Sequence, residues 1–200
     1  MIQHITIPCI TTTSSNPMLD ATETGILLHL CRGTVLEIGT HKGATTTRMA
    51  EVADRVVTVD VLEVPHTTIE GHEGCCLPPS EIGCQIPATL RSKVTQHLIN
   101  PNVPGELGRV LKSEGVLYDL IFIDGDHSIA GVQRDFETSA PWLSPTGVML
   151  FHDCWWREGD TEMGPMHLLR RHGGIILNKT LLGVLEVHLD RLYTHLRSSC

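Results

Sequence analysis

The sequence lacks any long hydrophobic run, which excludes a membrane-spanning helix. No apolar segment among the 200 residues approaches the length of such a helix, which needs roughly 20 consecutive apolar residues. Residues 1–13 also lack the basic region that begins a secretory signal peptide. We therefore expect a cytoplasmic protein that does not work at a membrane.

Positive charge is scarce as well. The chain has 15 Lys and Arg residues against 23 Asp and Glu residues, for a net charge of −8. Proteins that bind nucleic acid usually carry a basic surface, often interleaved with aromatic side chains. The composition therefore argues against a nucleic-acid partner.

Internal repeats, low-complexity tracts and signs of a second domain are absent too. A hydrophobic content of 41% is enough to build one core. We predict a single domain over residues 1–200, interrupted at about 62–92 by a stretch with four prolines and three cysteines. Long loops in compact domains are commonly functional, so this stretch is predicted to be a lid-like insertion.

The seven cysteines are an odd number, which favours a reduced protein over a disulfide scaffold. One group has residue types that bind zinc: His66, His72, Cys75, Cys76 and Cys84. Their spacing matches no standard zinc finger or ribbon. A structural metal site and a cysteine-rich mobile loop are both left open.

Helical and strand-like patterns alternate along the chain. Helices are predicted from Asn16-Pro17 to Arg32-Gly33 and at 44–52, 104–111, 129–140 and 163–172. Strands are predicted at 35–38, 55–61, 94–99, 118–124, 148–152, 174–178 and 182–187. This alternation predicts an α/β fold with a doubly wound, seven-stranded, mostly parallel sheet that ends in an antiparallel hairpin.

A glycine-spaced turn follows the first predicted strand. Its pattern, E-x-G-x-x-x-G, comprises Glu37, Gly39 and Gly43, whereas a dinucleotide site would show G-x-G-x-x-G. The carboxylate of Glu37 would repel a pyrophosphate and favour a cationic ligand such as S-adenosylmethionine. The alternative is an ordinary tight turn between a strand and a helix.

An acidic residue, Asp60, ends the second predicted strand. In open α/β sheets, a carboxylate at such a strand end often holds the hydroxyls of a ribose. Asp60 is therefore predicted to bind the ribose of a nucleoside cofactor. The alternative is that it caps a helix.

Two further strand ends carry ionisable groups. Asp124, Asp126 and His127 follow one strand, and Asp153 follows another. Two carboxylates could share a hard divalent cation such as Mg²⁺, and His127 could act as a general base. Alternatively, Asp126 and Ser128 cap the next helix, and His127 and His152 form only the walls of a pocket.

Four ordered segments resemble one known family: LEIGTHKG, VVTVDV, YDLIFIDGDHSIAGVQRDF and TGVMLFHDCWW. They are similar to class I S-adenosylmethionine-dependent methyltransferases, of the methyltransferase-24 type. This type is related to the cation-dependent O-methyltransferases, and the resemblance covers roughly residues 25–188. It implies a Rossmann-like methyltransferase fold.

The resemblance also implies roles for individual residues. The implied cofactor site consists of Glu37, Gly39, Thr40, Gly43, Ala44, Asp60, Val61, Asp124 and His127. The implied catalytic residues are His127, Asp126 and Asp124, and the implied metal ligands are Asp124, Asp153 and Cys154. Cys154 stands where the cation-dependent enzymes have asparagine, and cysteine is a poor ligand for Mg²⁺. The presence and identity of a metal therefore stay open.

The implied reaction is O-methylation of a small-molecule hydroxyl. Trp155 and Trp156 follow the site and could form an apolar wall for the acceptor. The alternative is that they pack in the core or at the interface of a homodimer. Two other functions stay open. One is a non-catalytic domain that binds S-adenosylmethionine; the other is a metal-dependent hydrolase or nucleotide-binding enzyme that uses the Asp and His residues.

Overall fold

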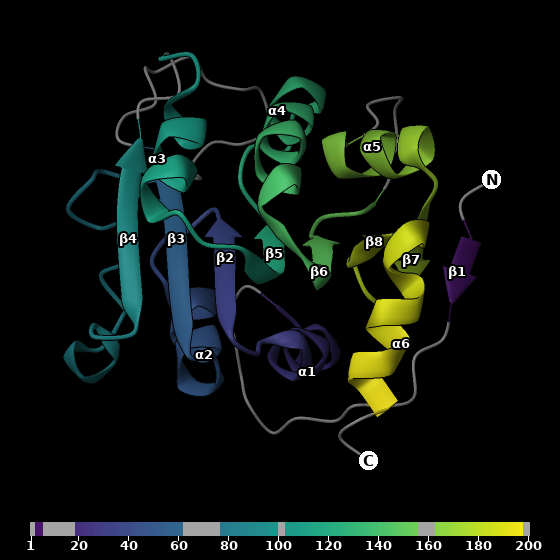
Figure 1. Ribbon diagram of the computed structural model, residues 1–200, viewed down its shortest axis with the longest axis horizontal. Helices are drawn as coiled ribbons and strands as arrows, with labels where there is room; N and C mark the ends of the chain where they lie inside the picture. The colour runs from purple at the N-terminus through teal and green to yellow at the C-terminus, as the bar shows by residue number, and fades with distance from the viewer. Residues whose placement is uncertain (1–2, 6–18, 62–76, 100–102, 156–162, 198–200) are drawn as a thin grey trace.

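The computed structural model describes residues 3–5, 19–61, 77–99, 103–155 and 163–197. These residues form one sheet with helices on both faces (Figure 1). The strands are β1 (Gln3–Ile5), β2 (Thr34–Ile38), β3 (Arg55–Val61), β4 (Val94–Ile99), β5 (Tyr118–Ile123), β6 (Leu143–Phe151), β7 (Gly174–Leu177) and β8 (Gly183–Leu185). The helices are α1 (Ala21–Leu30), α2 (Ala44–Val52), α3 (Glu106–Glu114), α4 (Ile129–Ser139), α5 (Gly164–His172) and α6 (Leu189–Arg197).

The strand order is β1-β7-β8-β6-β5-β2-β3-β4. Strands β2 to β6 pair in parallel, and β8 is antiparallel to both β6 and β7. The doubly wound sheet and its closing hairpin are confirmed. An eighth strand, β1, pairs in parallel with β7 at one edge and was not among the seven predicted strands.

Two apolar layers hold the sheet between the helices. One layer joins the sheet to α1, α2 and α6 and includes Leu27, Met49 and Leu192. The other joins the opposite face to α3, α4 and α5 and includes Leu111, Val132 and Leu169. The central strands are buried on both faces, so they read in the sequence as continuous apolar runs. Among the described residues, no helix has the length and apolar character to cross a membrane.

Helix α1 begins later than predicted. Its first residue is Ala21, and the predicted start at Asn16-Pro17 lies outside the described residues. Asp20 caps the helix by accepting hydrogen bonds from the backbone N–H groups of Thr22 and Glu23. Glu23 in turn accepts one from the N–H of Asp20. This capping box satisfies the free donors of the first turn and fixes the start of the helix.

The start of β6 and the presence of α6 also differ from the prediction. Strand β6 begins at Leu143 instead of Val148, because it continues through Gly147 and pairs with β5 across a register shift. Helix α6 was not predicted, although Leu192 packs fully buried against the core. Both the start of β6 and the formation of α6 depend on tertiary packing.

The described part of the predicted insertion is docked on the glycine turn. The N–H of Gly83 donates to the carbonyl of His41 over 2.8 Å, and the N–H of Gln85 donates to that of Lys42 over 2.8 Å. A short 3-10 helix, Ala88–Leu90, follows. Of the predicted zinc-type group, the described member is the exposed Cys84; the other four residues lie outside the described ranges.

Candidate active site

The candidate site lies where four neighbouring strands end. Ile38 of β2 is in register with Val59 of β3 and with Ile123 of β5, and Ile123 is in register with Phe151 of β6. Chain connections leave β2 toward β3 on one side and return through β5 on the other. Ligands of open α/β sheets bind at such a switch point. Because the strands are parallel, the residues that follow them are brought to one edge.

The glycine turn after β2 is packed closely against protein atoms. Gly39 has φ 108°, and a Cβ there would lie 2.1 Å from the carbonyl oxygen of Asp124. Gly43 has φ 87°, and its Cβ would lie 2.6 Å from Ile86 Cγ1. The space that both glycines release is therefore taken by β5 and by the docked insertion. The role of both glycines in the cofactor site stays a prediction.

Glu37 is fully buried beneath the turn. Its Oε2 accepts hydrogen bonds from the hydroxyls of Thr46 and Thr58, and Thr58 Oγ1 lies 2.6 Å from Thr40 Oγ1. Within the described residues, Oε1 has no hydrogen-bond partner. Burial raises the pKa of Glu37 to about 8, and the nearby charges of Asp124 and Asp60 act in the same direction. Glu37 thus stabilises the turn through buried hydrogen bonds, and its side chain is not exposed at the surface of the site.

Asp60 is the penultimate residue of β3, lies beside the turn and is partly exposed. Its Oδ2 accepts a hydrogen bond from the N–H of His41 over 2.6 Å, and its Oδ1 accepts one from the N–H of Val61 over 2.7 Å. A carboxylate oxygen can accept more than one hydrogen bond. Asp60 therefore holds the turn in place and keeps capacity to bind hydroxyl groups.

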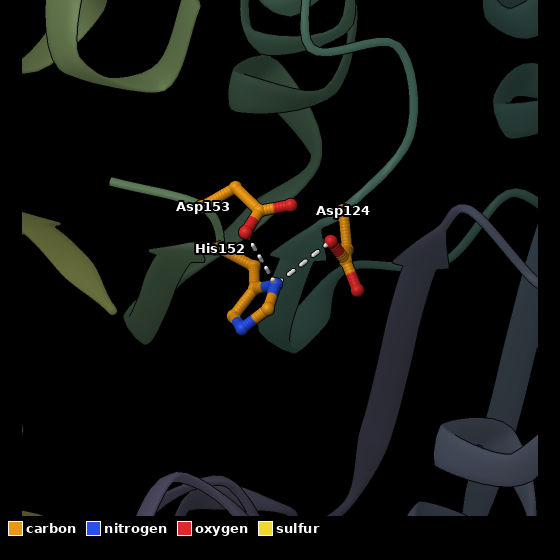
Figure 2. A group of neighbouring side chains, drawn as sticks. All are labelled: Asp124, His152 and Asp153. Carbon is orange, nitrogen blue, oxygen red and sulfur yellow. Dashed lines mark hydrogen bonds and ion pairs between the residues drawn. The ribbon is translucent and has the colours of Figure 1, made fainter. Parts of the chain in front are cut away.

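Four side chains from the ends of β5 and β6, Asp124, His127, His152 and Asp153, form what we call the Asp/His cluster. His152 Nδ1 lies 3.1 Å from Asp124 Oδ1 and 3.7 Å from Asp153 Oδ1 (Figure 2). His127 Nε2 lies 3.5 Å from Asp124 Oδ1 and 3.3 Å from Asp153 Oδ2. Each imidazole therefore bridges the two aspartates.

Burial and opposite charge compete within this cluster. Burial would lower the pKa of both histidines, but the two aspartates raise the pKa of His127, and Asp124 with Glu23 raises that of His152 to about 10. Burial alone would raise the pKa of Asp124, yet hydrogen bonds from the two histidines hold it below its ordinary value. The two carboxylates thus need positive charge between them, from a proton or from a cation.

Asp126 lies apart from these contacts. Its Oδ1 accepts a hydrogen bond from the N–H of Ser128 over 2.9 Å, and its Oδ2 lies 4.0 Å from an Arg134 nitrogen. Ser128 caps helix α4 by accepting from the N–H of Gly131. Ser128 is therefore the helix cap, Asp126 supports the turn before it, and the catalytic role of Asp126 stays a prediction.

A family model for a methyltransferase domain matches residues 36–154 of this chain. This match covers more than half of the chain. The chain belongs to the methyltransferase-24 family.

Two solved O-methyltransferase structures share the fold of this methyltransferase domain. An O-methyltransferase from Bacillus cereus in complex with SAH is 18% identical, with a TM-score of 0.54 over 88% of this chain and 84% of that one. The O-methyltransferase TomG from Streptomyces achromogenes, in complex with SAM, is 16% identical, with a TM-score of 0.53 over 84% of this chain and 82% of that one. MycE, a methyltransferase of mycinamycin biosynthesis, is 19% identical over 61% of this chain, with a TM-score of 0.41. The chain spans 28% of the length of MycE.

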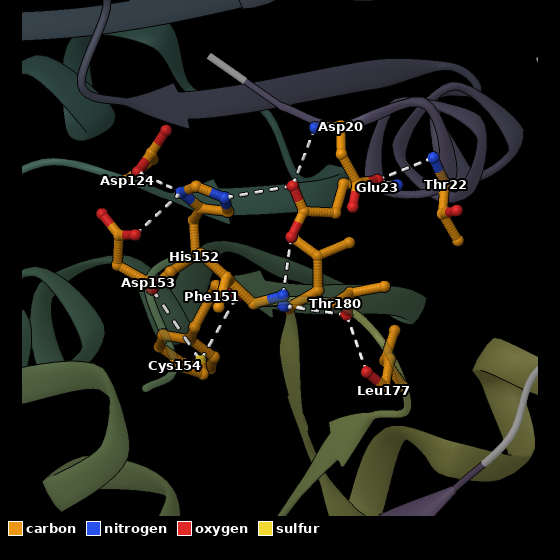
Figure 3. A network of polar contacts seen from close by, with 12 residues as sticks. Asp20, Thr22, Glu23, Asp124, Phe151, His152, Asp153, Cys154, Leu177 and Thr180 are labelled. Carbon is orange, nitrogen blue, oxygen red and sulfur yellow. Dashed lines mark hydrogen bonds and ion pairs between the residues drawn. The ribbon is translucent and has the colours of Figure 1, made fainter. Parts of the chain in front are cut away.

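In this methyltransferase domain, the structure turns Cys154 away from the position predicted for it. Its Sγ lies 3.5 Å from the carbonyl oxygen of Phe151 and 3.8 Å from that of His152 (Figure 3). Burial, together with the nearby carboxylates, raises the pKa of this thiol. In the described chain, the side chains whose ligand atoms lie within 4.8 Å of one another are Asp124, His152 and Asp153. The third member of this group of potential metal ligands is therefore His152, and not Cys154.

The sequence analysis missed two polar residues of this region. His152 was considered only as a pocket wall, and Glu23 of α1 was not considered at all. Glu23 Oε2 lies 3.6 Å from His152 Nε2, and both residues are buried. The D-x-x-E spacing of Asp20 and Glu23 was a readable signal for a capping box, but it carried no sign of the contact with His152.

Proposed function

We propose that this chain is an S-adenosylmethionine-dependent methyltransferase that methylates a hydroxyl group of a small molecule. The observation that carries the proposal is the meeting of the glycine turn, Asp60 and the Asp/His cluster at adjacent strand ends around the switch point. A cofactor held over β2 and β3 would present its methyl group toward the cluster. The SAH and SAM complexes of two O-methyltransferases with this fold support the choice of cofactor.

The residues around the turn fit this cofactor better than a dinucleotide. Asp60 would bind the ribose hydroxyls, and α2 begins beside it after Gly43, which has no side chain to cap the helix. Asp60 and Asp124 flank the turn with carboxylates, which disfavour phosphate and favour a sulfonium and an ammonium group. Glu37 would contribute indirectly, because its carboxyl group orients the hydroxyl of Thr58, which in turn contacts the hydroxyl of Thr40 in the turn.

A divalent cation fits between Asp124, His152 and Asp153. Neighbouring ligands of an octahedral ion lie about 3.0 Å apart and opposite ones about 4.2 Å, if each bond is about 2.1 Å. The separations of 3.1 and 3.7 Å from His152 Nδ1 fall within this range. Oxygen and nitrogen donors together suit Mn²⁺ or another transition metal better than Mg²⁺. Such an ion would lower the pKa of an acceptor hydroxyl.

In this proposal, His127 would receive the proton of that hydroxyl. Its Nε2 faces both aspartates, at 3.5 and 3.3 Å, so the imidazolium formed by proton uptake is stabilised by two carboxylates. General-base catalysis of this kind requires a hydrogen bond to the acceptor in the bound complex. Trp155, partly buried next to Asp153, would contribute an apolar wall for the acceptor. The docked insertion would shape the entrance as a lid.

The proposal is tested by calorimetry with S-adenosylhomocysteine and by transfer of a labelled methyl group. We expect the wild-type protein to bind the product and to methylate members of a panel of catechols, phenols and sugar alcohols. If the protein fails to bind S-adenosylhomocysteine, the proposed cofactor is wrong. Binding without transfer to any acceptor in the panel would favour the non-catalytic domain.

A further inference from the structure

Glu23 is a buried carboxylate with three separate contacts. Its Oε1 accepts a hydrogen bond from the N–H of Leu181 over 2.6 Å, and its Oε2 accepts one from the N–H of Asp20 over 3.0 Å. The same Oε2 lies 3.6 Å from His152 Nε2, an ion-pair distance (Figure 3). Only 4% of Glu23 is exposed. One side chain thus joins the start of α1, the turn between β7 and β8, and the Asp/His cluster.

The imidazole of His152 lies between Glu23 on one side and the two aspartates on the other. Nε2 faces Glu23, whereas Nδ1 faces Asp124 and Asp153. An ionised carboxylate can only accept hydrogen bonds. Nδ1 also faces carboxylates, so both ring nitrogens carry hydrogen in the metal-free protein, in keeping with a pKa of His152 raised to about 10. A cation between the aspartates would replace the hydrogen on Nδ1 and leave the hydrogen on Nε2, which Glu23 can accept. Figure 2 shows Nδ1 facing an oxygen of each aspartate.

We propose that Glu23 is a positioning residue, which fixes the ring orientation and tautomer of His152 so that Nδ1 is offered to a divalent cation between Asp124 and Asp153. The inference rests on the cation site proposed above. Metal-binding histidines are commonly oriented in this way by a carboxylate on their second nitrogen, and loss of that carboxylate weakens metal binding by about 10- to 100-fold. Glu23 itself stays outside the ligand set, since it faces the opposite edge of the ring.

A purely structural role for Glu23 makes a different prediction. The capping of α1 and the hydrogen bond from Leu181 would explain its burial without any effect on the cation. Asp20→Ala separates the two roles, because it removes the two hydrogen bonds that Asp20 accepts at the helix start but leaves the carboxylate of Glu23 beside His152. Glu23→Gln removes the negative charge that faces His152, so the hydrogen on Nε2 of the metal-bound ring would lose its charged acceptor.

The test measures Mn²⁺ binding by electron paramagnetic resonance for the wild type, Glu23→Gln and Asp20→Ala. We expect Glu23→Gln to weaken binding by about 10- to 100-fold, and Asp20→Ala to lower the melting temperature with an affinity close to wild type. Nitrogen NMR shifts of His152 in the metal-free protein, followed against pH, should show a lower pKa in Glu23→Gln than in the wild type and an unchanged pKa in Asp20→Ala. Glu23→Asp, which keeps the charge but withdraws it from the ring, should weaken binding in the same direction and serves if the glutamine variant does not fold.

Two outcomes would overturn the inference, and they can be told apart. Equal Mn²⁺ affinity of Glu23→Gln and wild type would reduce Glu23 to a structural residue while the cation site stands. Absence of Mn²⁺ binding by the wild type would remove the cation site and this inference together. Calorimetry with S-adenosylhomocysteine on the same samples would show whether the cofactor assignment survives.

Discussion

The backbone of Gly39 packs against the carbonyl group of Asp124, so closely that a Cβ at position 39 would lie 2.1 Å from that oxygen. The contact fixes the turn after β2 against the end of β5, across the switch point of the sheet. The turn proposed to hold the cofactor and the first aspartate of the Asp/His cluster are therefore placed as one rigid unit.

Gly39→Ala should destabilise the fold and weaken cofactor binding together. The added Cβ would clash with the backbone of Asp124, and alanine is strained at the positive φ of this position. Together these effects should lower the free energy of unfolding by about 2 to 5 kcal/mol. Gly105→Ala is the control, because Gly105 has φ 74° but no atom within 4 Å of its Cβ position; a loss of about 1 to 2 kcal/mol is expected there. Urea denaturation measures both. Equal losses would show that the clash is relieved without cost.

Asp60→Asn should weaken binding of S-adenosylhomocysteine by about 10- to 100-fold. The reason is that Asp60 is one of the two carboxylates, with Asp124, that flank the turn. Calorimetry measures the affinity. Asp54→Asn carries the same charge change at an exposed position next to the other end of β3 and should bind as the wild type does. If both variants bind normally, Asp60 does not hold the ribose.

His127→Ala should leave cofactor affinity close to wild type, whereas methyl transfer falls by about 10²- to 10⁴-fold through loss of the general base. Asp126→Asn should retain activity, because Asp126 contacts Ser128 and Arg134 instead of the cluster. Single-turnover kinetics with labelled cofactor separate binding from chemistry. The reverse pattern would transfer the role of base to Asp126.

Chelation by EDTA should lower methyl transfer and leave binding of S-adenosylhomocysteine unchanged, and Mn²⁺ should restore activity better than Mg²⁺. Cys154→Ser should respond in the same way as the wild type, because its thiol is directed to backbone carbonyls. Activity assays in the presence of each ion measure this. A cysteine variant that no longer responds to Mn²⁺ would return Cys154 to the ligand set.

Glu37→Gln should change how stability depends on pH. Burial raises the pKa of Glu37 from 4.5 to about 8 in the folded state, so between these values the unfolded chain releases a proton that the folded protein keeps. The contribution of Glu37 to stability is therefore lost as pH rises through this window. Glutamine has no such proton. The free energy of unfolding of the variant should therefore rise by about 1 to 4 kcal/mol relative to that of the wild type as the pH goes from 5 to 8.

Urea denaturation at the two pH values measures this divergence. Glu51→Gln serves as the control, because Glu51 lies partly exposed on α2 beside Arg48. It should track the wild type across the whole range. A constant difference between Glu37→Gln and wild type would mean that Glu37 titrates normally in the folded protein.

Local patterns were enough to predict most of the elements. The bounds of α2, β3 and β4 agree with those predicted, because periodicity and punctuation by glycine and asparagine act over a few residues. The bounds of β6 and the existence of α6 were not predicted, since both depend on partners distant in the chain. The pairing of β1 with β7 likewise joins residues from opposite ends of the sequence.

The sequence by itself determined that Asp60, Asp124 and Asp153 follow strand ends, and the crossover rule for parallel strands then brings them to one edge of the sheet. It could not determine which neighbour of Asp153 faces the same way. Successive residues near a strand end point to opposite sides, and the left-handed backbone of Asp153, at φ 53°, turns the chain there. The fold therefore directs His152 toward the aspartates and Cys154 into the core. Packing of α1 against the sheet adds Glu23, a contact between residues too far apart in the chain for any local pattern to reveal.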